Sequence, residues 1–152
     1  RNDISTWTML KNIELLDICK QEDWYKSLKN EKTKKYYIYL DNQNNFLGLI
    51  RMDEIDLINR SIRVGCDILK SKRSLGFGSK GYDLILDYCF NFMNMNRVWL
   101  EVIKYNKFAI KLYQNKGFLI EGVYRQNIFR NGKYYDSLLL GLLKKEYIKN
   151  YK

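Results

Sequence analysis

A glycine-containing loop between an alternating segment and an amphipathic segment constrains the fold of this chain more than any other feature. Residues 61–69 (SIRVGCDIL) alternate apolar and polar side chains, as a strand does. The loop follows at residues 70–79 (KSKRSLGFGS). After it, apolar residues recur at helical spacing, namely Tyr82, Ile85, Leu86, Cys89 and Phe92. The sequence therefore predicts a strand, a glycine loop and a helix, in that order.

The chemistry of this loop suits a phosphate ligand. Its glycines allow consecutive backbone N–H groups to turn toward one point at the start of a helix, where the helix dipole also favours negative charge. Mobile positive charge is expected around it from Lys70, Lys72, Arg73 and Lys80. We therefore predict a pyrophosphate-binding loop, although the same glycines could do no more than permit a tight turn.

Two familiar phosphate-binding patterns do not account for the loop. A P-loop needs Ser or Thr after its lysine, and Lys80 is followed by Gly81. The dinucleotide-binding fingerprint does fit residues 76–81, with Glu101 about 20 residues further on as its acidic partner. That fold repeats its strand–helix–strand unit, however, and this chain offers one such unit flanked by hairpins.

A third pattern, Arg-x-x-Gly-x-Gly, is formed by Arg73, Gly76 and Gly78 and resembles the acetyl-CoA loop of the GNAT acetyltransferases. Downstream, residues 97–104 predict a strand, and residues 105–118 predict a short helix that ends at a glycine. The residues that are similar to the second half of that family, in order and spacing, are Leu100-Glu-Val102, Asn106, Ala109, Leu112-Tyr113 and Gly117-Phe118. The resemblance covers nearly the whole chain and implies acetyl-CoA as the cofactor.

The resemblance implies one GNAT domain over residues 1–152, of the α/β (α+β) class. Such a domain has a mixed, mostly antiparallel twisted sheet with helices on both faces and a central βαβ unit that binds acetyl-CoA. An additional strand usually precedes the first helix in GNAT proteins, and we expect it to be missing from this chain. The sequence therefore does not decide which strand forms one edge of the sheet.

Local patterns agree with this fold. Asn131-Gly132 is a strong two-residue hairpin signal between the last two predicted strands. The further strands are predicted at residues 35–40, 46–52, 119–129 and 133–143, and the further helices near Trp7 and Leu10 and at residues 21–30.

Composition narrows the setting of the protein. The chain has 152 residues, 46% of them hydrophobic, which is enough for one domain with a real core. No apolar stretch approaches the roughly 18 residues of a membrane span, so we expect no membrane partner. The three cysteines, at positions 19, 66 and 89, have neither metal-ligand spacing nor an even count for disulfides. We therefore expect a reduced, cytoplasmic setting and no metal site.

The net charge of +10 raises the question of a nucleic-acid partner, because lysine and arginine contacts to phosphate dominate such binding. The lysines are scattered among acidic residues, however, and no aromatic platform for single strands is evident. Nucleic acid is therefore not favoured. A positive field would attract an anionic cofactor or substrate and repel a polyamine.

The catalytic candidates follow from the chemistry and the resemblance together. Acetyl transfer from a thioester to an amine needs a neutral amine, close alignment, and a proton for the departing thiolate. The chain contains no histidine, so carboxylates, tyrosines and thiols remain. By resemblance, Tyr113 stands where GNAT enzymes hold the general acid that faces the CoA sulfur. Glu101 resembles the glutamate that, in N-terminal protein acetyltransferases, is proposed to take the proton of the amine, directly or through water.

The cofactor-binding residues also follow from the resemblance. Asn106 would bond the pantetheine arm through its side chain, and three residues of the strand before the loop would do so through their backbone. The full set is Cys66, Asp67, Ile68, Arg73, Ser74, Leu75, Gly76, Phe77, Gly78, Ser79 and Asn106.

Each catalytic candidate has a structural alternative. Tyr113 could simply pack on Ala109 in the core. Glu101 could be a partly buried structural carboxylate, since it shares a strand face with Trp99 and Ile103. The thiols of Cys66 and Cys89 are interpreted as small core groups, because each lies within an apolar element.

The acceptor is the least constrained part of the function. Residues at both ends of the chain, including Arg1-Asn-Asp3 and Asn131-Gly-Lys-Tyr-Tyr-Asp136, resemble the branch of nucleotide-amino-sugar acetyltransferases of the pseudaminic acid type. That branch implies a UDP-linked 4-amino sugar, on which Trp7, Tyr134 and Tyr135 could stack, unless they only pack. The C-terminal half is also similar to spermidine and ribosomal-protein acetyltransferases.

Three alternatives therefore stay open beside the sugar. The acceptor could be a polyamine or a protein N-terminus, and the chain could be a GNAT-like or nucleic-acid-binding module without catalysis. A homodimer is one assembly open to such a domain, and the sequence leaves the oligomeric state undecided.

Overall fold

The fold is known from a computed structural model, which describes residues 8–10 and 17–151. Within these residues, six strands form one sheet in the order β1-β2-β3-β4-β6-β5. The strands are β1 (Lys35–Leu40), β2 (Phe46–Asp56), β3 (Ser61–Ile68), β4 (Arg97–Ile103), β5 (Leu119–Arg130) and β6 (Lys133–Leu143). Only β3 and β4 are parallel, and every other neighbouring pair is antiparallel. The predicted mixed, mostly antiparallel sheet is confirmed.

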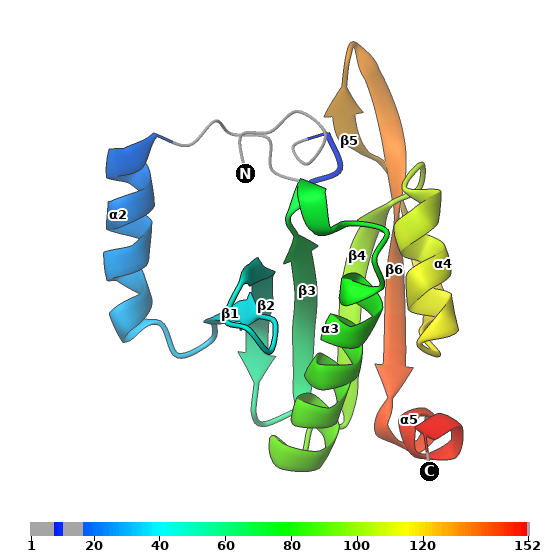
Figure 1. Cartoon of the computed structure of the whole chain (residues 1–152). Helices are drawn as coiled ribbons and strands as arrows, with labels where there is room; N and C mark the ends of the chain where they lie inside the picture. Colours follow the sequence, from blue (N-terminus) through cyan, green and yellow to red (C-terminus); the bar gives the residue numbers. More distant parts are fainter. Residues whose placement is uncertain (1–7, 11–16, 152) are drawn as a thin grey trace.

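The helices differ in how they relate to this sheet. Helices α3 (Phe77–Asp87) and α4 (Lys107–Asn115) lie against the same face, with α3 crossing over between β3 and β4 (Figure 1). Helix α2 (Ile18–Ser27) stands apart, has no buried residue, and reaches the sheet through Trp24, whose ring meets the edge of Tyr36 at 4.9 Å. A short helix, α5 (Lys144–Tyr151), follows the last strand and was not predicted.

Helix boundaries follow local hydrogen bonds more than apolar spacing. The helix predicted at residues 21–30 begins at Ile18, because the Asp17 carboxylate accepts a bond from the Lys20 N–H at 2.8 Å and caps it. Its last residues, Leu28–Asn30, form a 3-10 turn. Helix α3 already begins at Phe77, so part of the predicted glycine loop belongs to its first turn.

The apolar face of α3 was predicted correctly except at its end. Tyr82, Ile85, Leu86 and Cys89 are all buried, whereas Phe92 is 75% exposed. The reason is a π-helical turn at Tyr88–Phe92, which has more residues per turn and rotates Phe90 inward instead. Phe90 then stacks on Tyr147 of α5 at 4.8 Å.

The hydrophobic core lies between the sheet and the two helices α3 and α4. On β4, Val98, Leu100 and Val102 point into it, so Trp99 and Glu101 point to the opposite face. On β3, Ile62 and Val64 point into the core, while Arg63 and Asp67 lie on the opposite face. One face of the sheet is therefore apolar, and the other carries the charged side chains of β2, β3 and β4. Among the described residues no helix is long and apolar enough to cross a bilayer.

Candidate active site

The central feature of the site is a gap in the sheet between its two parallel strands. β3 and β4 pair only at Ser61–Arg97, Ile62–Val98 and Arg63–Trp99, although β3 continues to Ile68 and β4 to Ile103. Beyond these pairs the strands diverge toward the end where α3 begins (Figure 1). Diverging strands turn unpaired backbone groups toward the gap, where an extended ligand can bond them in strand fashion. The predicted residues Cys66, Asp67 and Ile68 lie on this part of β3.

The glycine loop lies at the open end of this gap. A 3-10 turn at Lys70–Lys72 leads from β3 to Gly76, which caps α3 with a φ of +81° that favours glycine. The N–H groups in the first turn of α3, from Phe77 to Ser79, have no carbonyl of their own helix to bond. Such N–H groups, together with the positive end of the helix dipole, suit an anionic ligand.

The space beside these N–H groups is also open. A Cβ built on Gly76 meets nothing within 4 Å, and one built on Gly78 meets only Leu112 and Ile68, at 3.7 and 3.8 Å. A phosphate can therefore approach the backbone closely, so the predicted loop fits the pyrophosphate of acetyl-CoA. The loop residues Ser74 and Leu75 are exposed.

Arg73 differs from the prediction. Its side chain was expected to supply mobile charge, but its Nε donates a hydrogen bond to the carbonyl oxygen of Ile68 at 3.2 Å. The guanidinium thus ties the loop to the end of β3. The 3-10 turn at residues 70–72 reverses the chain and brings the Arg73 side chain within hydrogen-bonding distance of Ile68. The spacing of apolar residues in the sequence carries no signal for this turn.

Tyr113 approaches the gap from the helical side of the sheet. Its ring meets Tyr82 edge to face at 5.1 Å and lies 6.1 Å from Phe118. Burial raises the pKa of Tyr113, while a hydrogen bond from Tyr82 and the charge of Arg51 lower it and Asp67 raises it. The net shift is upward, so the phenol is protonated at neutral pH, as a general acid must be.

Glu101 approaches the gap from the opposite face of the sheet. Its Oε1 accepts a hydrogen bond from the Ser137 hydroxyl at 2.6 Å and another from the Asn127 side-chain amide at 3.1 Å. Neither partner was predicted. The signal available in the sequence was a serine within the otherwise apolar run of residues 137–143. The catalytic candidates Tyr113 and Glu101 thus flank one gap from two faces.

A third unpredicted residue, Arg51 of β2, lies across β3 on the charged face. Its Nε is 2.9 Å from the Asp67 carboxylate, and its Nη1 is 3.7 Å from Asp53. Burial alone would lower the pKa of Arg51, but Asp67 and Asp53 raise it above its usual value. The guanidinium fits there because position 65 is glycine, where a Cβ would lie 2.6 Å from Nη2.

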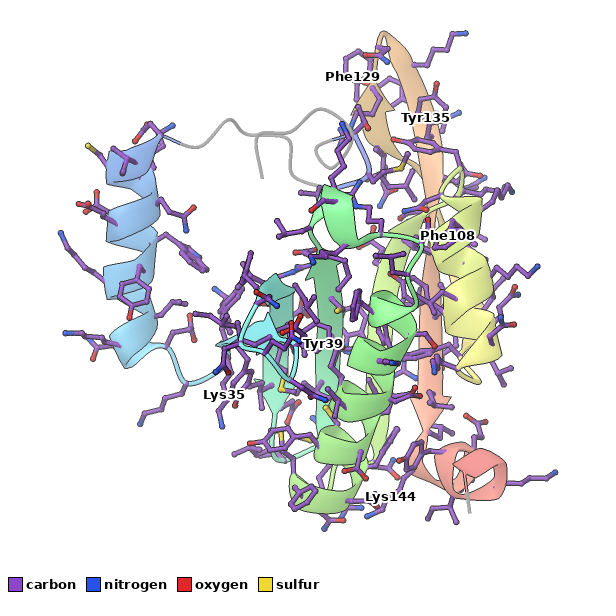
Figure 2. All side chains as sticks on the ribbon, in the orientation of Figure 1. Lys35, Tyr39, Phe108, Phe129, Tyr135 and Lys144 are labelled. Atoms are coloured by element: carbon purple, nitrogen blue, oxygen red, sulfur yellow. The ribbon has the colours of Figure 1, made fainter. Side chains whose placement is uncertain are left out.

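The remaining predicted residues have local partners. Asn106 caps α4, with its side-chain oxygen accepting the Ala109 N–H at 3.2 Å, so a bond to pantetheine would fall to its amide nitrogen. Tyr134 is 64% exposed and lies 5.0 Å from Phe129. Tyr135, on the β5–β6 hairpin, meets the edge of Tyr105 at 5.0 Å (Figure 2). A stacking role for these tyrosines stays a prediction, and Trp7 lies outside the described residues.

The two thiols in apolar elements are confirmed as packing groups. Burial raises the pKa of both Cys66 and Cys89 to about 12, so both are protonated and weakly nucleophilic at neutral pH. Cys66 packs against Gly81, where a Cβ would lie 2.8 Å from the sulfur.

Two hollows on the surface lie outside the gap. One, of about 780 Å³, is lined by the β1–β2 turn and the outer side of α3, and of the predicted cofactor residues only Phe77 borders it. Figure 2 shows Tyr39 between that hairpin and α3. The other, of about 570 Å³, is lined by residues 123–127 of β5, next to Glu101 through Asn127.

Known proteins share both the sequence pattern and the fold. A family model described as "Acetyltransferase (GNAT) family" matches residues 2–118. A spermidine N(1)-acetyltransferase of Vibrio cholerae is 29% identical over 127 residues, covering 84% of this chain and 73% of the relative. The corresponding enzyme of Escherichia coli K12 is 24% identical over 140 residues, covering 92% and 72%.

A solved structure extends this similarity to the whole fold. It is the V. cholerae spermidine N-acetyltransferase in complex with CoA and spermine, with a TM-score of 0.92 and 26% identity. The match covers 97% of this chain and 87% of that one. Together with the glycine loop at the head of α3 and the gap between β3 and β4, these matches show that the chain belongs to the GNAT family and is an N-acetyltransferase that uses acetyl-CoA.

Proposed function

We propose that the acceptor is the primary amine of a polyamine, a class that includes spermidine and spermine. The relatives with spermidine in their names support this acceptor, as does the related structure that holds spermine. The nucleotide-linked amino sugar expected from the chain ends finds no support among them. The polyamine alternative is therefore the stronger one.

The observation that carries this proposal is the charge on the face of the sheet turned away from α3. Its carboxylates outnumber its guanidinium groups, and Asp67 and Glu101 lie on the parts of β3 and β4 that border the gap. The carboxylates are Asp53, Glu54, Asp67, Glu101 and Glu121, and the guanidinium groups are Arg51, Arg63 and Arg97. This local excess of negative charge attracts a polycation. The net charge of +10 pointed the other way because it sums lysines over the whole surface, whereas a ligand in the gap feels the nearest charges most strongly.

The residues of the chain divide the reaction between them. Acetyl-CoA supplies an activated acyl group on a thioester. The α3 N-terminus and the loop would hold the pyrophosphate, and the edge of β3 that faces the gap, at residues 66–68, would hold the pantetheine arm. The amine would enter from the charged face, where Glu101 would take its proton as the N–C bond forms. Tyr113, on the other face, would protonate the sulfur as the C–S bond breaks.

A competition assay tests the acceptor. Acetyl-CoA consumption is measured with spermidine, with a UDP-linked 4-amino sugar and with a peptide carrying a free N-terminus. We expect the highest kcat/KM for spermidine. A clear preference for the sugar or the peptide contradicts the polyamine and leaves the acetyltransferase activity in place.

A further inference from the structure

Three strands hold the Glu101 carboxylate. Glu101 comes from β4, Ser137 from β6 and Asn127 from β5, and both donors bond the same oxygen, Oε1. A carboxylate on a strand has two torsions free to rotate beyond χ1, so two donors on one oxygen orient the whole group. The direction in which Glu101 presents its carboxylate is therefore set by residues distant in sequence.

The burial of Ser137 shows that its hydroxyl serves Glu101. The side chain is 0% exposed, in the middle of a strand where branched apolar residues are favoured. A buried hydroxyl is costly unless it is hydrogen-bonded, and the Ser137 hydroxyl donates to Glu101 at 2.6 Å. A purely structural position of this kind would favour valine or alanine.

The second donor is carried by a β-bulge. The register of β5 against β6 shifts between Tyr124 and Ile128, and Gln126 has a φ of +52°. Asp136 holds this bulge, because its Oδ1 accepts the Gln126 N–H at 3.1 Å while Oδ2 binds Lys104 at 2.9 Å. Bulges commonly redirect a side chain beside an active site, and this one directs Asn127 to Glu101.

We infer that Ser137 and Asn127 are positioning residues, which hold the Glu101 carboxylate in the orientation that takes the proton from the acceptor amine. This inference rests on the proposed function. The hollow lined by residues 123–127 adjoins the carboxylate through Asn127, so an acceptor seated there lies beside Glu101. Charged groups near the Glu101 carboxylate include Arg125 in the lining of the hollow and Arg63, which lies over Trp99 on the same strand face. Two ion pairs are also near, Lys104–Asp136 and, across the gap, Arg51–Asp67.

A double-mutant cycle in kcat tests the inference, with the full chain, acetyl-CoA and the best of the three amines offered. Ser137→Ala and Asn127→Ala should each lower kcat roughly fivefold or more, with the acetyl-CoA Kd unchanged. In a Glu101→Gln background the same changes should lower kcat further by less than about twofold. The reason is that a residue that acts through the Glu101 carboxylate then has no carboxylate to orient. If Ser137 and Asn127 were merely structural, their variants would lower the stability of the protein. The fold losses in kcat would then multiply with that of Glu101→Gln.

Matched variants separate the outcomes. Asn59→Ala removes a similar amide–carboxylate bond, 2.7 Å to Asp56 in the β2–β3 turn, and should leave kcat unchanged. If Ser137→Ala does not fold, Asn127→Ala decides alone, because that side chain is exposed. The inference is overturned if kcat falls less than about fivefold in Asn127→Ala or Glu101→Gln, or if the losses simply multiply. Wild-type protein that acetylates none of the amines overturns the proposed function, and this inference with it.

Discussion

Tyr82 of α3 and Tyr113 of α4 meet edge to face, with ring centroids 5.1 Å apart and planes at 65°. Tyr82 is fully buried, and burial keeps its pKa well above the usual value, so it stays protonated as a hydrogen-bond donor. Its bond lowers the pKa of Tyr113 against the effect of burial. The donor therefore favours the ionised phenol that remains after Tyr113 has released its proton.

Removal of the Tyr113 hydroxyl tests the general acid directly. Tyr113→Phe keeps the packing on Tyr82 and Phe118 and removes only the hydroxyl. We expect kcat to fall about 10²-fold or more, with acetyl-CoA affinity nearly unchanged. Stability should fall by about 1–3 kcal/mol, because the buried Tyr82 hydroxyl loses its acceptor. Steady-state kinetics beside calorimetry measures these quantities. Turnover within threefold of wild type would leave Tyr113 a packing residue.

The partner of Tyr113 has a smaller expected effect. Tyr82→Phe removes the bond that lowers the pKa of Tyr113, so that pKa rises further and the phenolate is stabilised less. We expect kcat to fall several-fold and the alkaline limb of the pH–rate profile to move to higher pH. Tyr147→Phe is the matched control, since Tyr147 is also buried and stacked on a phenylalanine but lies on α5. An unmoved alkaline limb in Tyr82→Phe contradicts the role.

The phosphate site can be blocked at Gly78. Gly78→Asp places a carboxylate among the N–H groups that would hold the pyrophosphate, so we expect acetyl-CoA binding to be lost. At 100 times its Kd a ligand stabilises the fold by about 2.7 kcal/mol, which thermal shift detects in wild type. Gly78→Ala is the folding control, because its Cβ would make only ordinary contacts, the nearest at 3.7 Å. Wild-type affinity in Gly78→Asp would place the pyrophosphate elsewhere.

The close approach of Arg51 to Gly65 predicts a cost in stability. In Gly65→Ala the new methyl would lie 2.6 Å from Nη2, and the guanidinium cannot move without weakening its bonds to Asp67 and Asp53. We expect the free energy of unfolding, measured by urea denaturation, to fall by about 1–3 kcal/mol. Gly122→Ala is the control, since nothing lies within 4 Å of its Cβ. Equal stability of the two variants would show that Arg51 is easily displaced.

The thiol pKa values predict selective labelling. Burial raises the pKa of Cys66 and Cys89 to about 12, whereas Cys19 is exposed on α2. Iodoacetamide at neutral pH should therefore alkylate Cys19 first, since the thiolate is the reactive form. Labelling of the buried pair should become fast only as the pH rises toward their pKa values or the protein unfolds. Peptide mass spectrometry over a time course measures the order.

The sequence by itself determined the local elements and the cofactor. Alternation in residues 61–69, the glycines at 76 and 78, and Asn131-Gly132 each act over a few residues, so strand, loop, helix and hairpin could be read from spacing. The same spacing carried the resemblance that implied acetyl-CoA. The π-helical turn at Tyr88–Phe92 was not predicted. Its extra residue changes which side chains face the core only after the turn, so the apolar spacing before it gives no warning.

Tertiary structure decided what surrounds the reacting groups. The pairing of β3 with β4, the contact of Arg51 with Gly65 and the hydrogen bond of Ser137 to Glu101 each involve residues that lie 14 to 36 positions apart. No local pattern specifies such pairs. Charge shows the difference most clearly. Summed over the sequence it is +10 and repels a polyamine, yet the fold gathers Asp53, Glu54, Asp67 and Glu101 on one face of the sheet. Electrostatic interactions weaken with distance and with screening by salt, so the arrangement of nearby charges, which only folding creates, outweighs their total.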